Sequence, residues 1–384
     1  MSPWKNFQFA VAAIPLLALM GEGAARLAHR LGRYTPKIIT ESYLQPNPYL
    51  YQIPTPGASV QAHLSRIDIN SLGFRNEEFA PRKPPGYYRI FVLGGSTTFG
   101  YPGSIPSNQE TFPYKLQLEL RKRLNTNHIE VINAGVIGYT LRTSLVNYVT
   151  RLTWYDPDML IVHHAVNDAI TVKDEDDLLR GVIRANSTPT LWELLRNQSY
   201  VLLELNYRFY RYFQRPSPVQ QKRSDEPSPT TLRSYEQNLR FLTTVAKSRD
   251  VQVVIANEGT IVPSRCDGLS IVGPERAGLE PIEKQVCFLL DWYFPHLTAT
   301  GVRRTFDQIA ALQQAVAGEN KLLWVDMNRI VPKTSEYYSD VCHTLPAGTT
   351  RIANALAELI QPSVEAKLRL TQSQSNQMPR LPGL

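Results

Sequence analysis

The chain has 384 residues, of which 43% are hydrophobic and 10% aromatic, a composition typical of a globular protein with one large domain or two small ones. Its formal net charge is +7, but lysine and arginine are scattered along the chain and form no basic block. Together with the lack of a nucleic-acid-binding motif, this scatter excludes nucleic acid as a predicted partner.

The N-terminal segment is apolar. Residues 7–20 read FQFAVAAIPLLALM, with a single polar member, and Lys5 precedes them. The stretch is shorter than the roughly 20 residues of a spanning helix, but it matches the apolar region of an export signal. We predict that residues 1–33 are an export signal kept as a membrane anchor, with the rest outside the cytoplasm. A cleaved signal peptide of a secreted protein is one alternative, and a buried N-terminal helix of a cytoplasmic protein is another.

Residues 34–88 are rich in proline, tyrosine and asparagine and contain turn-forming pieces such as NPYLYQIPTPG. We predict that they form an extension wrapped over the main domain. They are not expected to form a domain of their own.

From residue 89 to about residue 362, short apolar runs alternate with longer helical patterns. The runs lack the alternation of a half-exposed strand, which predicts strands buried on both faces. With helices between them, they predict one domain with a three-layer α/β fold and a parallel sheet. The predicted strands are 89–93, 129–134, 158–165, 251–257 and 322–327, and the helices lie near 111–125, 141–153, 299–317 and 348–360.

Two long inserts interrupt this domain, at about residues 171–235 and 259–298, and inserts of this length are usually lids, binding surfaces or loops. The second contains Cys266 and Cys287, which either form a disulfide in an oxidising compartment or stay unpaired and buried. With Cys342 they show no C-x-x-C spacing, so the sequence predicts no zinc site. The tail, residues 363–384, is predicted to be disordered.

A serine follows the first predicted strand directly, in the stretch GGSTTFG at 94–100. In open α/β sheets, ligands bind beyond the carboxyl ends of the strands. Gly94 and Gly95 permit a tight turn that exposes the hydroxyl of Ser96 at the start of the next helix. A phosphate-binding loop would need a lysine that is missing, and the glycine spacing does not fit a dinucleotide fingerprint. We therefore predict no nucleotide cofactor.

A serine becomes a nucleophile when a base accepts its proton and a third group orients that base. Asp340 and His343 lie three residues apart in the stretch SDVCH, between the last predicted strand and the last helix. This spacing allows one loop to hold both side chains beside Ser96. His163 and His164 end a predicted strand and either could line the pocket, but neither has an acid three residues before it.

Two further residues lie at strand ends and suit an oxyanion hole, in which donors stabilise a developing negative charge. Gly135 follows the strand at 129–134 and offers a backbone N–H, and Asn167 follows the strand at 158–165 and offers its side-chain amide. A turn glycine and a capping asparagine are the alternatives.

The stretches GGSTTFG, NAGVIGYT, AVND and DVCH resemble the four sequence blocks of the SGNH (GDSL-type) hydrolases, over about residues 89–362. The stretch INSLGFRNEEF at 69–79 resembles an N-terminal extension of membrane-anchored bacterial members. Two positions depart from the pattern: Gly95 stands where the family usually has aspartate, and Ala165 stands where it usually has glycine.

The resemblance implies a flavodoxin-like sheet and esterase chemistry that uses neither metal nor cofactor. It assigns Ser96 as nucleophile, His343 as general base and Asp340 as its orienting acid, with the N–H groups of Ser96 and Gly135 and the Asn167 amide as oxyanion donors. We predict hydrolysis of a carboxylic ester, with O-acetyl groups on an envelope carbohydrate as the expected substrate. An O-acyltransferase with the same residues and a catalytically silent envelope carbohydrate-binding protein are the alternatives.

Overall fold

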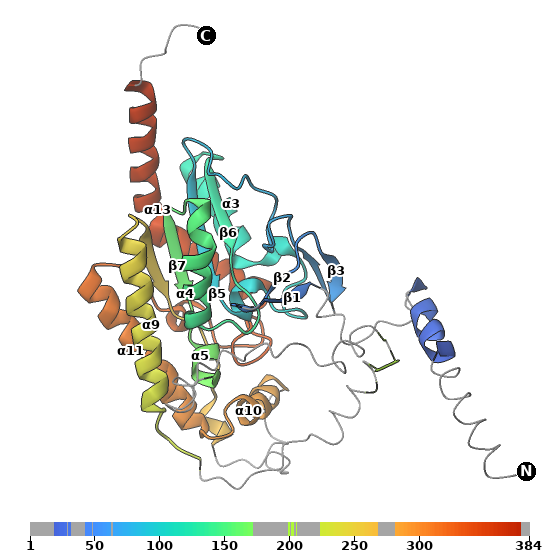
Figure 1. Cartoon of the computed structure of the whole chain (residues 1–384). Helices are drawn as coiled ribbons and strands as arrows, with labels where there is room; N and C mark the ends of the chain where they lie inside the picture. Colours follow the sequence, from blue (N-terminus) through green and yellow to red (C-terminus); the bar gives the residue numbers. More distant parts are fainter. Residues whose placement is uncertain are drawn as a thin grey trace, which may run out of the picture.

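Five parallel strands form the central sheet of the computed structural model (Figure 1). Every residue of the first and third of these strands is buried, as expected for strands that helices cover on both faces. In chain order the strands are β5 (Tyr88–Gly94), β6 (Ile129–Asn133), β7 (Met159–His163), β8 (Gln252–Ala256) and β9 (Leu323–Val325). In space the order is β6-β5-β7-β8-β9, which is the flavodoxin-like order, so the predicted fold class is confirmed.

Helices cover both faces of this sheet (Figure 1). On one face, α3 (Phe112–Leu124) packs against α13 (Pro346–Gln377). On the other face, α4 (Leu141–Thr150), α9 (Pro229–Lys247) and α11 (Ala299–Asn320) pack side by side. The strand order reverses between β5 and β7, and in folds of this kind the ligand crevice lies at that reversal. Ser96 and Asn167 follow these two strands.

The helix α9 corrects the predicted insert at 171–235, whose last residues belong to the helical layer. Ser228 caps the helix by accepting a hydrogen bond from the backbone N–H of Thr231, and Pro229 occupies the first helical position. Residues 224–231 read SDEPSPTT, and their prolines and serines favour a loop, but they include the start of this helix. A second helix, α10 (Pro281–Tyr293), lies within the predicted insert at 259–298.

The predicted disordered tail at 363–384 is wrong for residues 363–377, because α13 continues to Gln377. The buried residues Ile360, Val364 and Leu368 lie four positions apart and keep one apolar stripe against the domain. Pro362 lies inside the helix without ending it. Residues 378–384 lie outside the described residues.

The extension before the domain forms two antiparallel hairpins, one from β1 (Leu44–Asn47) and β2 (Tyr51–Pro54), the other from β3 (Ser59–Ala62) and β4 (Ser65–Asp68). It contacts the end of the short helix α2 (Ser96–Phe99). The ring of Tyr43 stacks on that of Phe99, with centroids 5.7 Å apart. The buried guanidinium of Arg75 donates to the backbone carbonyls of Phe99 and Gly100. The extension thus supports the segment that carries Ser96.

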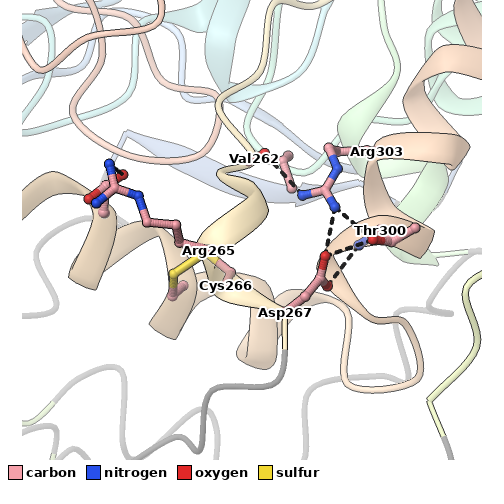
Figure 2. The surroundings of a disulfide bond; sticks show 8 residues. Val262, Arg265, Cys266, Asp267, Thr300 and Arg303 are labelled. Atoms are coloured by element: carbon pink, nitrogen blue, oxygen red, sulfur yellow. Dashed lines mark hydrogen bonds and ion pairs between the residues drawn. A yellow bond between two sulfur atoms is a disulfide. The ribbon is translucent and has the colours of Figure 1, made fainter. Parts of the chain in front are cut away.

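A disulfide joins Cys266 to Cys287 of α10, which decides between the two alternatives for this pair (Figure 2). Beside it, Arg303 of α11 donates to Asp267 at 2.6 Å. The hydroxyl of Thr300 donates to the same carboxylate oxygen at 2.6 Å. The contacts of Asp267 thereby fasten the first part of the second insert to α11, and the disulfide joins that part to α10.

Among the described residues, none of the helices is both long enough and apolar enough to cross a membrane. The predicted anchor lies largely outside them, since the described chain begins with a helical stretch at residues 19–28. The structure describes residues 19–28, 30–31, 43–47, 49–62, 64–171, 199, 201–202, 205, 223–267 and 281–377.

Candidate active site

The structure brings Ser96, His343 and Asp340 into one chain of hydrogen bonds. The Ser96 hydroxyl oxygen lies 2.7 Å from His343 Nε2. On the other side of the imidazole, Nδ1 lies 2.6 Å from Asp340 Oδ2. Both distances are within hydrogen-bonding range, so a proton can pass from the hydroxyl to the ring without any rearrangement.

The position of Ser96 depends on the two glycines before it. A side chain on Gly94 would overlap that of Thr98, one turn into α2, and would lie 2.9 Å from the backbone oxygen of His163. A side chain on Gly95 would overlap the Asn167 amide. The absence of both Cβ atoms lets α2 start directly at the end of β5, with Ser96 as its first residue.

Asp340 is held by the loop that carries His343. Its Oδ1 accepts the backbone N–H groups of Cys342 and His343, at 3.0 and 2.9 Å, while Oδ2 faces the imidazole. Burial raises the pKa of this carboxyl, but the charge of His343 and these hydrogen bonds outweigh burial and lower it. Asp340 is therefore ionised at neutral pH and can stabilise an imidazolium at His343.

Tyr101 covers the imidazole, a contact that sequence analysis missed. Its ring stacks on that of His343, with centroids 4.1 Å apart and planes 20° from parallel. The tyrosine is 38% exposed, so it forms part of the rim beside Ser96. The sequence signal was weak: an aromatic residue one position after the GGSTTFG stretch.

Cys342 lies beside the site but is a poor nucleophile. It is buried, and burial and the nearby Asp340 charge raise the pKa of its thiol well above the ordinary value. Asp340, Cys342 and His343 also offer three potential metal-ligand atoms within 4.8 Å of one another. However, Asp340 Oδ2 and His343 Nδ1 are only 2.6 Å apart, shorter than the roughly 3.4 Å between two ligand atoms of a tetrahedral zinc site at ligand distances of about 2.1 Å. These atoms fit a hydrogen-bonded pair better than a metal site.

The two other predicted donors lie at the same edge of the sheet. Asn167 Nδ2 donates to the carbonyl of Tyr139 at 2.9 Å, which fixes the amide against Gly95 and leaves its second N–H for a substrate oxygen. The N–H of Gly135 donates to Asn133 Oδ1 at 3.1 Å, so it would have to exchange this bond to serve an oxyanion.

Gly135 has a clear steric role. A Cβ atom there would lie 2.6 Å from the backbone nitrogen of Phe99 and 2.7 Å from Thr98 Cβ. The missing side chain lets the loop after β6 pack closely against α2.

His163 and His164 do not line the site, because both are buried in the core beneath it. His164 Nε2 lies 2.8 Å from the hydroxyl of Ser144, and its Nδ1 lies 3.9 Å from Asp168. These three residues resemble a catalytic triad in composition, but each is almost fully buried, so a substrate cannot reach them. Burial lowers the pKa of His164 to about 3, with a further lowering by His163.

Asp168 should make the stability of the protein depend on pH. Burial raises its pKa to about 8, although the Leu141 N–H that it accepts opposes the shift. The folded state therefore holds a proton that the unfolded chain releases above its ordinary pKa of 3.8. Through Asp168 alone, the free energy of unfolding decreases as pH rises from 3.8 to about 8, by at most about 1.4 kcal/mol per pH unit.

His164 has the opposite effect: through this residue the free energy of unfolding increases with pH between its folded pKa of about 3 and its ordinary pKa of 6.5. The free energy of unfolding is therefore expected to show a net decrease only from pH 6.5 to about 8. Urea unfolding at several pH values in this range measures it. Asp168→Asn should flatten the curve there, and an equally steep decrease in the variant would contradict the assignment.

No family model and no curated protein matches the sequence. Solved structures do match the fold. A lipase/acylhydrolase from Enterococcus faecalis is 14% identical over 72% of this chain and 96% of its own, with a TM-score of 0.41. A variant of an acetyl xylan esterase from Geobacillus stearothermophilus is 17% identical over 71% of this chain and 94% of its own, with a TM-score of 0.39. An α/β hydrolase from the metagenome of Lake Arreo, Spain, is 15% identical over 74% of this chain and 99% of its own, with a TM-score of 0.40. Such low identities and TM-scores leave the activity to be inferred from the site itself.

Proposed function

We propose that this protein is a serine hydrolase that cleaves carboxylic esters through an acyl-enzyme. One observation carries the proposal: the uninterrupted hydrogen bonds from Ser96 through His343 to Asp340, at 2.7 and 2.6 Å. A nucleophile, a base and an orienting acid in this order are what acyl transfer to a serine requires. The bond from Ser96 to His343 joins residues 247 positions apart in the sequence, which argues against a local turn contact.

In the proposed reaction, the Ser96 oxygen attacks the ester carbonyl while His343 Nε2 takes its proton. Asp340 keeps the proton of the ring on Nδ1 and stabilises the imidazolium without accepting the proton itself. The carbonyl oxygen becomes an oxyanion, which the free Asn167 N–H and the Ser96 backbone N–H stabilise. His343 then protonates the leaving alcohol, and finally activates the water that releases the acid.

For the substrate we propose acyl groups, O-acetyl above all, on an envelope carbohydrate. The partly exposed ring of Tyr101 beside the nucleophile supports this choice, since it offers a flat amphipathic surface for a sugar ring. Transfer of the acyl group to a second sugar would use the same residues. Product analysis with an acetyl ester and a glycan acceptor separates hydrolysis from transfer.

We also propose that the domain acts outside the cytoplasm, held by the N-terminal segment or released after its cleavage. The Cys266–Cys287 disulfide supports an oxidising compartment. An alkaline phosphatase fusion after residue 40 tests export, because an inactive reporter would contradict it.

A fluorophosphonate tests the ester-hydrolase proposal, because it reacts only with an activated serine. The intact protein should take up one label, on the peptide that contains Ser96, and the heat-unfolded chain should take up none. Ser96→Ala should remain unlabelled. Failure of the folded wild-type protein to label, or a label on another serine, would refute the proposal.

A further inference from the structure

A buried carboxylate joins two of the elements that carry the site. Glu258 lies in the loop after β8 and is 4% exposed. Its Oε1 accepts a hydrogen bond from the hydroxyl of Thr97, the residue after Ser96. Its Oε2 accepts the backbone N–H groups of Ala165 and Val166, at 2.7 and 2.6 Å, at the start of α5 (Val166–Thr171). Asn167 is the next residue of that helix.

The same loop also reaches the third element of the site. The backbone N–H of Ile261 donates to the carbonyl of Val341 at 2.8 Å, between Asp340 and His343. One short loop therefore holds the serine helix, the turn before the asparagine and the histidine loop. Within the loop, Glu258 is the residue whose side chain contacts the first two.

The hydrogen bonds of Glu258 connect two separate elements of the site. A buried carboxylate is costly unless it is fully hydrogen-bonded, and Glu258 meets this condition with three donors from two separate elements. The two donors proposed for the oxyanion are the N–H of Ser96 and the amide of Asn167. Each lies within two residues of a group bound to Glu258. The carboxylate thus fixes the separation of the two donors.

We propose that Glu258 is a positioning residue for the oxyanion hole, an inference that rests on the proposed ester hydrolysis. Glu258 touches neither substrate nor reacting atoms and acts through Thr97 and the start of α5. Misplacing a donor by a fraction of an ångström weakens its bond to the transition state more than to the ground state. Loss of Glu258 should therefore lower kcat and leave KM nearly unchanged.

The experiment measures kcat and KM for an acetyl ester, with kcat expressed per serine labelled by the fluorophosphonate. Glu258→Gln keeps the size of the side chain and removes the charge. Thr97→Val removes only the bond to α2. We expect kcat per labelled site to fall roughly 10- to 100-fold for Glu258→Gln and by less for Thr97→Val, with KM within about twofold of wild type.

Glu130→Gln is the matched control. Glu130 is also a largely buried carboxylate, paired with Arg89 at 2.7 Å on the strand β6, and has no bond to the site. This variant should lose thermal stability but keep its kcat per labelled site.

Two results would overturn the proposal. One is a wild-type kcat per labelled site in Glu258→Gln, and the other is an equal fall of kcat in Glu130→Gln. Loss of labelling in wild type would instead refute the proposed function, so the two failures are distinguishable. If Glu258→Gln does not fold, Thr97→Val still tests the hydrogen bond between Glu258 and α2. An unchanged kcat in Thr97→Val would count against the proposal.

Discussion

Replacing Ser96 by alanine is expected to lower kcat for ester hydrolysis by about 10⁶-fold, since the reaction then lacks its nucleophile. His343→Ala should cause a loss of similar size, because the hydroxyl attacks only when the imidazole 2.7 Å away accepts its proton. The double variant should be no worse than either single one, because the two groups act as a unit. Such low rates are measured by incubating the protein with an activated acetyl ester for several hours and then quantifying the product.

Ser144→Ala is the matched control for this series. Its hydroxyl also lies 2.8 Å from a histidine Nε2, that of His164, with an aspartate beyond it, but the group is buried in the core. The control should keep a wild-type kcat. An active Ser96→Ala protein, or losses that multiply in the double variant, would contradict the assigned roles of Ser96 and His343.

The sheet could be predicted from the sequence because each strand is a short run of apolar residues with helical patterns between them. All five predicted strands are present, and their ends differ by at most two residues. Burial on both faces removes the alternation that a half-exposed strand would show, so this signal comes from the strand itself. No long-range information was needed.

The helices α9 and α13 show where such prediction stops. The start of α9 contains serine and proline, which favour a loop and a helix N-terminus equally well. The extra turns of α13 carry Val364 and Leu368, which continue the apolar stripe of Ile360 at a spacing of four residues and are buried against the domain. Tertiary packing extended the helix through a polar sequence that suggested disorder.

Ser96, Asp340, His343 and Asn167 could be located in advance because each lies at or just after a strand end, or in a loop with a chemical partner. Tyr101 and Glu258 could not. Tyr101 reaches the imidazole only after the loop beyond α2 folds back over it. Glu258 becomes relevant only when β8 lies beside β7, which brings its carboxylate to the start of α5.

The second large effect is expected from Gly95→Asp, the change that introduces the residue usual in the family that this sequence resembles. A Cβ atom at Gly95 would overlap Asn167 Nδ2 and would lie 3.3 Å from the carbonyl oxygen of Tyr139. The backbone carbonyl cannot move easily, whereas the amide is the end of a side chain and can. The variant should therefore fold and displace the Asn167 amide. We expect kcat to fall roughly 10²- to 10³-fold, as on removal of one oxyanion donor.

Gly95→Ala and Asn167→Ala distinguish this explanation from a general disturbance of α2. Alanine adds the same Cβ without a charge, so Gly95→Ala should lose about as much of kcat as Asn167→Ala does. In the Asn167→Ala background the added methyl group has no amide to displace, and the double variant should match Asn167→Ala alone. Additive losses would mean that the Cβ moves Ser96 instead of Asn167. A fully active Gly95→Asp protein would show that the asparagine amide does not serve the reaction from its present position.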